Sequence, residues 1–162
     1  MKALLAALAL STCLSGAGAQ AATPEPERAA VLTVVDAFFD AMRAKDGEAL
    51  RALSQPKAPL AAIAPAKDGG FAIGQSELET FAARVASAPA AFNERYWSPQ
   101  VLIDGRLAMV WTRYDFHRGD QFTHNGRDLF VLMKTDKGWK IVSLAFTTEP
   151  GGVSENPAGP PK

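Results

Sequence analysis

The chain has 162 residues, of which 48% are hydrophobic, and its 17 Lys and Arg are balanced by 17 Asp and Glu. This length suits one domain with a single hydrophobic core. A near-neutral chain without a Lys/Arg cluster lacks the basic surface that nucleic-acid binding requires, and no basic amphipathic helix indicates a membrane surface.

The first 19 residues have the pattern of a secretory signal peptide. Lys2 precedes an apolar run over 3–10, and small residues lead to a cleavage site after Ala19. The run is too short to span a bilayer, which takes about 20 apolar residues. We therefore expect export to the periplasm or the medium. In an alternative interpretation, residues 10–13 form a lipoprotein cleavage box with Cys13 as the lipidated N-terminus.

Cys13 is the only cysteine and lies inside this segment. The mature chain would then contain no thiol, so its core must be stable without disulfides in an oxidising compartment.

Two helices are expected next. Thr23 and the prolines that follow it are typical of a helix start, and apolar residues then recur at three- and four-residue spacing. These residues are Val31, Val34, Val35, Phe38, Phe39 and Met42. Lys45-Asp46-Gly47 ends this helix, and Asp46 is placed to cap a short second helix through Leu53.

Residues 58–73 are rich in Ala, with Pro59, Pro65 and a Gly69-Gly70 pair. They fit either two short strands around a glycine turn or an irregular lid, and we expect the hairpin, near the mouth of the domain. Residues 76–79 then read as a capping box that opens a third helix, in which Leu78, Phe81, Ala82 and Val85 form an apolar stripe.

Four strands follow, roughly over 92–103, 106–117, 121–135 and 139–148, joined by turns that contain Gly105, Gly119 and Gly138. Helices followed by an antiparallel meander predict the α+β class, with the N-terminal helices packed in a strongly curved, mostly antiparallel sheet. We assign this domain to residues 23–149. The composition of residues 150–162, rich in Pro, Gly and small polar residues, predicts a disordered tail.

The turn at Gly119-Asp120 sets the expected register of the central hairpin. A two-residue turn pairs Arg118 with Gln121 and so places Asp115 opposite His124. Such a pair could act as a general acid and base, with the carboxylate fixing the imidazole tautomer. The commoner alternative is a buried hydrogen-bonded pair that only maintains the register.

On the same predicted wall Trp111 faces Asp128 and Arg113 faces Gly126. Trp97, Trp111 and Tyr114 are candidates for stacking on a flat ligand, Arg113 for binding an anionic or carbonyl group, and Asp128 for a polar contact. Parity places Arg113 and Arg127 on opposite faces of the sheet.

Trp139 is expected in the core of the last hairpin. With two histidines, no HExxH spacing and no phosphate-binding glycine loop, we expect neither a metal nor a cofactor.

Several segments together resemble the nuclear-transport-factor-2-like superfamily, most closely its bacterial branch of lumazine-binding-like and polyketide-cyclase-like proteins. They are 94–99 (Glu-Arg-Tyr-Trp-Ser-Pro), 110–116 (Val-Trp-Thr-Arg-Tyr-Asp-Phe), 122–126 (Phe-Thr-His-Asn-Gly) and 138–144 (Gly-Trp-Lys-Ile-Val-Ser-Leu). The resemblance implies a cone-shaped α+β fold that is frequently dimeric through its open sheet face. Asn125 stands where close relatives often carry Cys, so thiol chemistry does not transfer.

The superfamily contains enzymes, ligand binders and structural dimers, so the fold does not select among them. We expect an exported protein that holds a small molecule in the cone, as a homodimer. The alternatives are a cofactor-independent isomerase, dehydratase or cyclase that uses Asp115 and His124, and a non-catalytic dimeric interaction module.

Overall fold

The computed structural model describes residues 25–149 and 151–159. The predicted signal peptide and the expected helix cap at Thr23 lie outside the described residues. The helices are α1 (Glu25–Ala44), α2 (Gly47–Leu53) and α3 (Leu78–Ser87). The strands are β1 (Pro59–Pro65), β2 (Phe71–Glu77), β3 (Phe92–Asp104), β4 (Leu107–Arg118), β5 (Gln121–Thr135) and β6 (Gly138–Thr147).

A side chain caps the start of α2, but no side chain caps the start of α3. Asp46 caps α2 as predicted, because its carboxylate accepts a hydrogen bond from the Ala49 amide at 2.9 Å. The predicted capping box of α3 is wrong. Ser76 and Glu77 are the last residues of β2, and Glu77 makes no side-chain cap. The pairing of β1 with β2 extends the chain up to the first residue of the helix.

The six strands form one sheet in the order β2-β1-β6-β5-β4-β3. All neighbours are antiparallel except β1 and β6, which run parallel with Leu60 beside Leu144. The predicted hairpin over 58–73 is confirmed as β1 and β2, although β2 continues to Glu77. The four later strands agree with their predicted ranges to within a residue, because turn glycines with positive φ at 105, 119 and 138 mark their ends.

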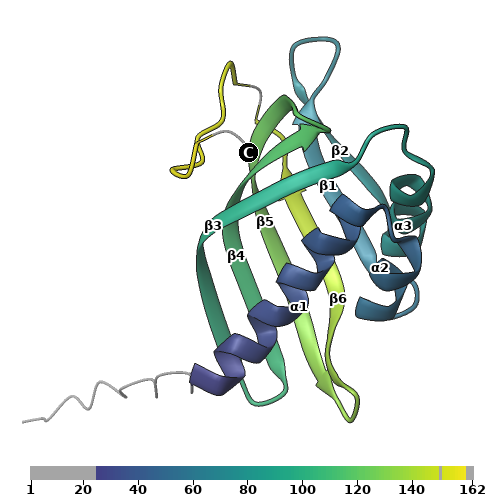
Figure 1. The fold of residues 1–162 in the computed structure, drawn as a ribbon, viewed down its shortest axis with the longest axis vertical. Helices are drawn as coiled ribbons and strands as arrows, with labels where there is room; N and C mark the ends of the chain where they lie inside the picture. Colours follow the sequence, from purple (N-terminus) through teal and green to yellow (C-terminus); the bar gives the residue numbers. More distant parts are fainter. Residues whose placement is uncertain (1–24, 150, 160–162) are drawn as a thin grey trace, which may run out of the picture.

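The curved sheet wraps around α1, which crosses its concave face, while α2 and α3 lie together toward one end (Figure 1). The apolar stripe of α1 faces inward, and Phe38 and Phe39 pack against Phe130 of β5 with ring centroids 5.4 and 5.7 Å apart. Trp139 is 5% exposed, so its predicted core position is confirmed. The α+β cone expected from the sequence is therefore the observed architecture.

A β-bulge changes the register between β4 and β5. His117 pairs with Phe122, as a two-residue turn requires, but the next pair is Phe116 with His124. Thr123 is the extra residue, and its hydroxyl donates to the carbonyl of Phe116 at 2.9 Å. Beyond the bulge every predicted pair is displaced by one position, so Asp115 pairs with Asn125. The predicted pairing of Asp115 with His124 is wrong for this reason.

Residues 151–159, which composition predicts to be disordered, contact the outer face of the sheet. Ser154 donates to Asp115 at 2.5 Å, and Asn125 exchanges hydrogen bonds with the backbone of Val153 and Glu155 at 3.0 Å. The composition of this segment indicates only the entropic cost of ordering it. It does not reveal that Asp115 and Asn125, two buried polar side chains of the sheet, form hydrogen bonds with the segment. We call residues 151–159 the C-terminal strap. No described helix combines the length and the apolar character that crossing a membrane would require.

Candidate functional site

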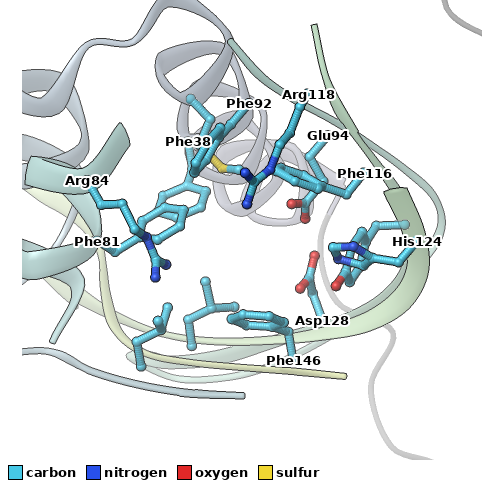
Figure 2. A pocket seen from close by; sticks show the side chains of 14 residues that line it. Phe38, Phe81, Arg84, Phe92, Glu94, Phe116, Arg118, His124, Asp128 and Phe146 are labelled. Atoms are coloured by element: carbon cyan, nitrogen blue, oxygen red, sulfur yellow. The ribbon is translucent and has the colours of Figure 1, made fainter. Parts of the chain in front are cut away.

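The interior of the cone contains a cavity of about 190 Å³ between α1, α3 and the concave face of the sheet. Figure 2 shows the 14 side chains that line it. They are Phe38, Met42, Leu60, Phe81, Arg84, Phe92, Glu94, Tyr114, Phe116, Arg118, His124, Asp128, Leu144 and Phe146. The lining is mainly apolar with a few polar groups, which is the usual character of a small-molecule site.

Aromatic rings form the walls. Phe81 stacks on Phe38 with centroids 6.0 Å apart, and Phe92 meets Phe116 edge to face at 5.3 Å. These contacts fix the rings around an open space and give a flat ligand surfaces on which to pack. Phe146 of β6 lines the cavity beside Asp128 (Figure 2).

Two carboxyl groups meet inside the cavity. Glu94 of β3 and Asp128 of β5 face one another within hydrogen-bonding reach (Figure 2). They are 9% and 2% exposed. Burial raises the pKa of Asp128 to about 7, and burial together with the neighbouring Asp128 charge raises the pKa of Glu94 well above its usual range. Near neutral pH the pair therefore retains a proton that bridges the two groups.

Asp128 keeps unused acceptor capacity. A carboxylate offers about four lone-pair sites, and one proton shared with Glu94 occupies one of them. Its Oδ2 atom is buried and has no other donor among residues 25–149 and 151–159. A buried acceptor without a donor is costly, so this atom favours a ligand that carries an N–H or O–H group.

His124 and Tyr114 complete the polar end of the cavity. Burial, and secondarily the charge of Arg118, lowers the pKa of His124 to about 4, so this imidazole is neutral at physiological pH. Its Nδ1 lies 2.9 Å from the hydroxyl of Thr123. The Tyr114 hydroxyl donates to the Thr147 carbonyl at 2.7 Å, and burial raises its pKa far above the ordinary value, so it stays protonated.

Gly126 makes room for that tyrosine. A Cβ atom at this position would lie 2.1 Å from the Thr147 carbonyl oxygen and 2.5 Å from Cε1 of Tyr114. Glycine is required here by close approach, since Tyr114 and Gly126 are cross-strand partners on the inward face.

Two arginines line the cavity at its opening. Arg84 comes from α3 and Arg118 from the end of β4, and both residues are solvent-exposed. Their Cζ atoms lie 5.2 Å from the Phe81 ring centroid and 5.8 Å from the Phe92 ring centroid. Within the described part of the chain neither guanidinium forms an ion pair or a hydrogen bond.

Of the residues predicted as sites, the structure brings three to the cavity, namely Tyr114, His124 and Asp128. Asp115 lies on the outer face, where it forms an ion pair with Arg95 and is fully buried under the strap. The predicted Asp115–His124 acid/base pair is therefore wrong, because the bulge at Thr123 places its members on opposite faces.

Trp97, Trp111 and Arg113 also lie on the outer face. Trp97 and Arg127 are both cross-strand partners of Arg113, so the prediction that Arg113 and Arg127 occupy opposite faces is wrong as well. Trp111 is 41% exposed and borders a shallow outer groove lined by Ile63, Ile73, Leu129 and Ala145 among others. Ligand stacking on these tryptophans within the cone is excluded by this geometry.

Sequence reasoning did not identify Glu94, Arg84 or Arg118. A signal was available for Glu94, since it precedes Tyr96 by two residues in a strand whose same-face neighbour Phe92 is apolar. An acidic residue at an inward position of a strand is unusual enough to indicate a site. No such signal marks the arginines, which have the exposure of ordinary surface residues. In the described ranges, 25–149 and 151–159, no group of three or more metal-ligating side chains gathers.

Comparisons with known proteins agree with the observed fold. Residues 26–147 match the family model described as "Putative lumazine-binding". A search of curated proteins found no match.

Among solved structures, an NTF2-like protein of unknown function from Shewanella baltica is 18% identical with a TM-score of 0.58, covering 80% of this chain and 98% of its own. A putative dehydratase of the NTF2-like family from Streptomyces avermitilis is 19% identical with a TM-score of 0.61, covering 78% and 99%. An NTF2-like protein from Cytophaga hutchinsonii is 20% identical with a TM-score of 0.60, covering 75% and 98%. At these identities the structural matches show the fold alone.

Proposed function

Because the chain belongs to the putative lumazine-binding family of the NTF2-like superfamily, we propose that it binds a small molecule inside the cone. The observation that carries this proposal is the buried Oδ2 atom of Asp128, which has no hydrogen-bond partner among the described residues, in a cavity walled by phenylalanines. A cone that served only as a scaffold would fill this space with apolar side chains, because an unsatisfied buried carboxylate destabilises the fold.

The family description suggests a first ligand to test. Lumazine is a flat bicyclic heterocycle with N–H donors and carbonyl acceptors. Its rings could stack between phenylalanines while an N–H donates to Asp128. The cavity volume of about 190 Å³ suits a compact molecule of one or two rings.

Native mass spectrometry of gently purified protein, followed by calorimetric titration with lumazine, tests the proposal. We expect a bound small molecule or saturable one-to-one binding of the probe. Phe116→Ala should weaken that binding, whereas Trp111→Ala on the outer face should leave it unchanged. A protein that carries nothing and binds no aromatic probe would refute the ligand-binding role and favour a structural module.

Acid/base catalysis is the second candidate function. The Glu94–Asp128 pair favours it, because a carboxyl group whose pKa lies near 7 can both give and accept a proton at neutral pH. In that case the reaction would be a cofactor-independent isomerisation, dehydration or cyclisation. Hydrogen–deuterium exchange at carbon atoms next to the carbonyl of a bound ketone would support it, provided that Asp128→Asn abolishes the exchange.

We further propose that the protein is exported and forms homodimers. Export rests on the signal-peptide pattern of residues 1–19.

Dimerisation rests on the outer sheet face, where large apolar residues are exposed together, namely Trp111, Met109, Leu107 and Met133. The same face of a second copy could cover the Trp111 indole and the outer groove that Trp111 borders. Analytical ultracentrifugation of the wild type and of Trp111→Gln tests this, and a wild type that remains monomeric at high concentration contradicts it.

A further inference from the structure

Resting on the proposed ligand-binding function, we propose that the ligand is an organic anion with two recognised ends. Its anionic group, a carboxylate or a group of similar chemistry, binds Arg84 and Arg118. Its flat apolar body packs on the phenylalanine walls, and an N–H or O–H group at the other end donates to Asp128.

The arginines carry the first part of this inference. They reach the same cavity from α3 and β4, elements that are distant in the sequence, and both guanidinium groups point into it (Figure 2). The rings of Phe81 and Phe92, over which they lie, have centroids 6.5 Å apart. Stacking on these rings orders the guanidinium groups while their N–H groups remain available. Two ordered guanidinium groups at one opening favour an anion.

The internal acids do not use this positive charge. If Arg84 and Arg118 neutralised Glu94 and Asp128, their charges would lower the pKa of both carboxyl groups. The pKa of each is raised instead, and neither arginine contributes to it. Asp115, the other buried carboxylate, already pairs with Arg95 on the outer face. As far as residues 25–149 and 151–159 are concerned, the two cations at the opening are therefore available to hold a charge brought by the ligand.

Asp128 carries the second part. The residue is 2% exposed, its carboxyl group faces the cavity (Figure 2), and its buried Oδ2 atom has no hydrogen-bond partner among residues 25–149 and 151–159. The proton shared with Glu94 occupies only one of its acceptor sites. A donor that enters the cavity can reach this carboxyl group, because Asp128 lines it. A wholly apolar anion, such as a simple fatty acid, would leave the acceptor unsatisfied and would bind less well than one carrying a hydroxyl or N–H group.

Matched probes separate the two ends. Calorimetric titration of the full-length protein would compare para-hydroxybenzoate with para-hydroxybenzyl alcohol, which lacks the charge, and with benzoate, which lacks the donor. The corresponding naphthalene analogues repeat the comparison with a longer body, so that an unsuitable length in one series does not mask the preference. We expect each carboxylate to bind about tenfold more tightly than its neutral counterpart, and this advantage to fall as salt is raised.

Variants assign each end to its residues. Arg84→Gln and Arg118→Gln should each remove most of the carboxylate preference and leave the affinity for the neutral alcohol within about twofold. Asp128→Asn should reduce the advantage of para-hydroxybenzoate over benzoate. Arg106→Gln, at an exposed turn outside the cavity, is the matched control and should change neither preference. Thermal melts of each variant exclude unfolding as the cause.

The outcomes distinguish this inference from the function on which it rests. Equal binding of charged and neutral probes in both series, or a carboxylate preference that survives both arginine substitutions, would overturn the anion assignment while the cone remained a ligand site. Binding of no probe in either series, together with no binding of lumazine, would overturn the proposed function itself.

Discussion

Glu94 of β3 and Asp128 of β5 face one another although β4 lies between their strands in the sheet. They are not in the same row of the sheet. Glu94 pairs with Phe116, which pairs with His124, and Asp128 lies four residues farther along β5. Curvature of the sheet closes this diagonal, and Gly126, between His124 and Asp128 on the inward face, gives its space to the Tyr114 ring. The contact between the two acids therefore depends on the shape of the cone.

The shared proton predicts how stability depends on pH. The folded-state pKa of Asp128 is raised from 3.8 to about 7, so the native state binds more protons than the unfolded state between these values. The free energy of unfolding should therefore fall as pH rises through this interval and beyond it, where Glu94 also retains protons. For Asp128 alone, at about 1.4 kcal/mol per pKa unit, the loss over this interval is on the order of 4 kcal/mol.

Asp128→Asn should remove much of this dependence, since an amide can donate to the Glu94 carboxylate without a titratable proton. Urea denaturation of the wild type and the variant at a series of pH values measures the difference between them, in which contributions from other groups largely cancel. Asp40→Asn, at an exposed position of α1, is the control. Parallel pH curves for wild type and Asp128→Asn would show that the pair holds no extra proton.

His124 should resist protonation. Its pKa is lowered to about 4, mainly by burial and then by the charge of Arg118. Between this value and 6.5 the folded state binds fewer protons than the unfolded state, so this residue contributes stability above pH 6.5 that is lost as pH falls toward 4. NMR titration of the imidazole measures it. Arg118→Gln should raise the pKa but keep it below 6.5, because burial is the larger cause. A wild-type pKa of 6.5 or higher would mean that His124 is solvated.

Gly126→Ala should strongly destabilise the fold. The added Cβ would lie 2.1 Å from the Thr147 backbone oxygen, so repacking of Tyr114 alone cannot relieve the overlap. We expect a loss of about 3 kcal/mol or more in the free energy of unfolding. Gly74→Ala in β2 is the matched control, with nothing within 4 Å of its Cβ. Denaturant melts compare the two, and rescue of Gly126→Ala by Tyr114→Ala would contradict the backbone explanation.

The C-terminal strap should contribute to stability through Ser154. Its hydroxyl donates to Asp115, which is fully buried. Removing it in Ser154→Ala leaves one carboxylate oxygen with fewer donors, at an expected cost of about 1–2 kcal/mol in urea melts. Ser87→Ala, which loses only an exposed hydrogen bond to the Arg84 carbonyl, should cost much less. Equal effects of the two substitutions would mean that the strap does not hold Asp115.

Most of the fold follows from local sequence patterns. Apolar spacing identifies α1, glycine turns delimit β3 to β6, and the order of helices and strands gives the class. The parallel contact of β1 with β6 has no local signal, because it joins segments about half of the chain apart. The same holds for the strap, which is ordered by polar groups on distant strands.

The site was harder to predict because one inserted residue decides it. The Thr123 bulge has no marker in the sequence, and threonine is an ordinary strand residue. Without the bulge, the pairing set by the turn places Asp115, Arg113 and Trp111 on the same face as His124, so the sequence predicts them in the interior. His124, Asp128 and Tyr114 line the cavity, and their roles as site residues stay predictions. The partner of Asp128 is Glu94, which only the curvature of the sheet brings close.

The pairing of Leu60 with Leu144 also determines when the cavity can exist. Both side chains line it, and they come from β1 near the start of the domain and from β6 near its end. Loop closure over such a separation is entropically costly and slow, so this contact is expected to form late in folding. Ligand binding is then a property of the completed chain. A protein caught during synthesis, before β6 emerges, would have its aromatic walls but no enclosed space between them.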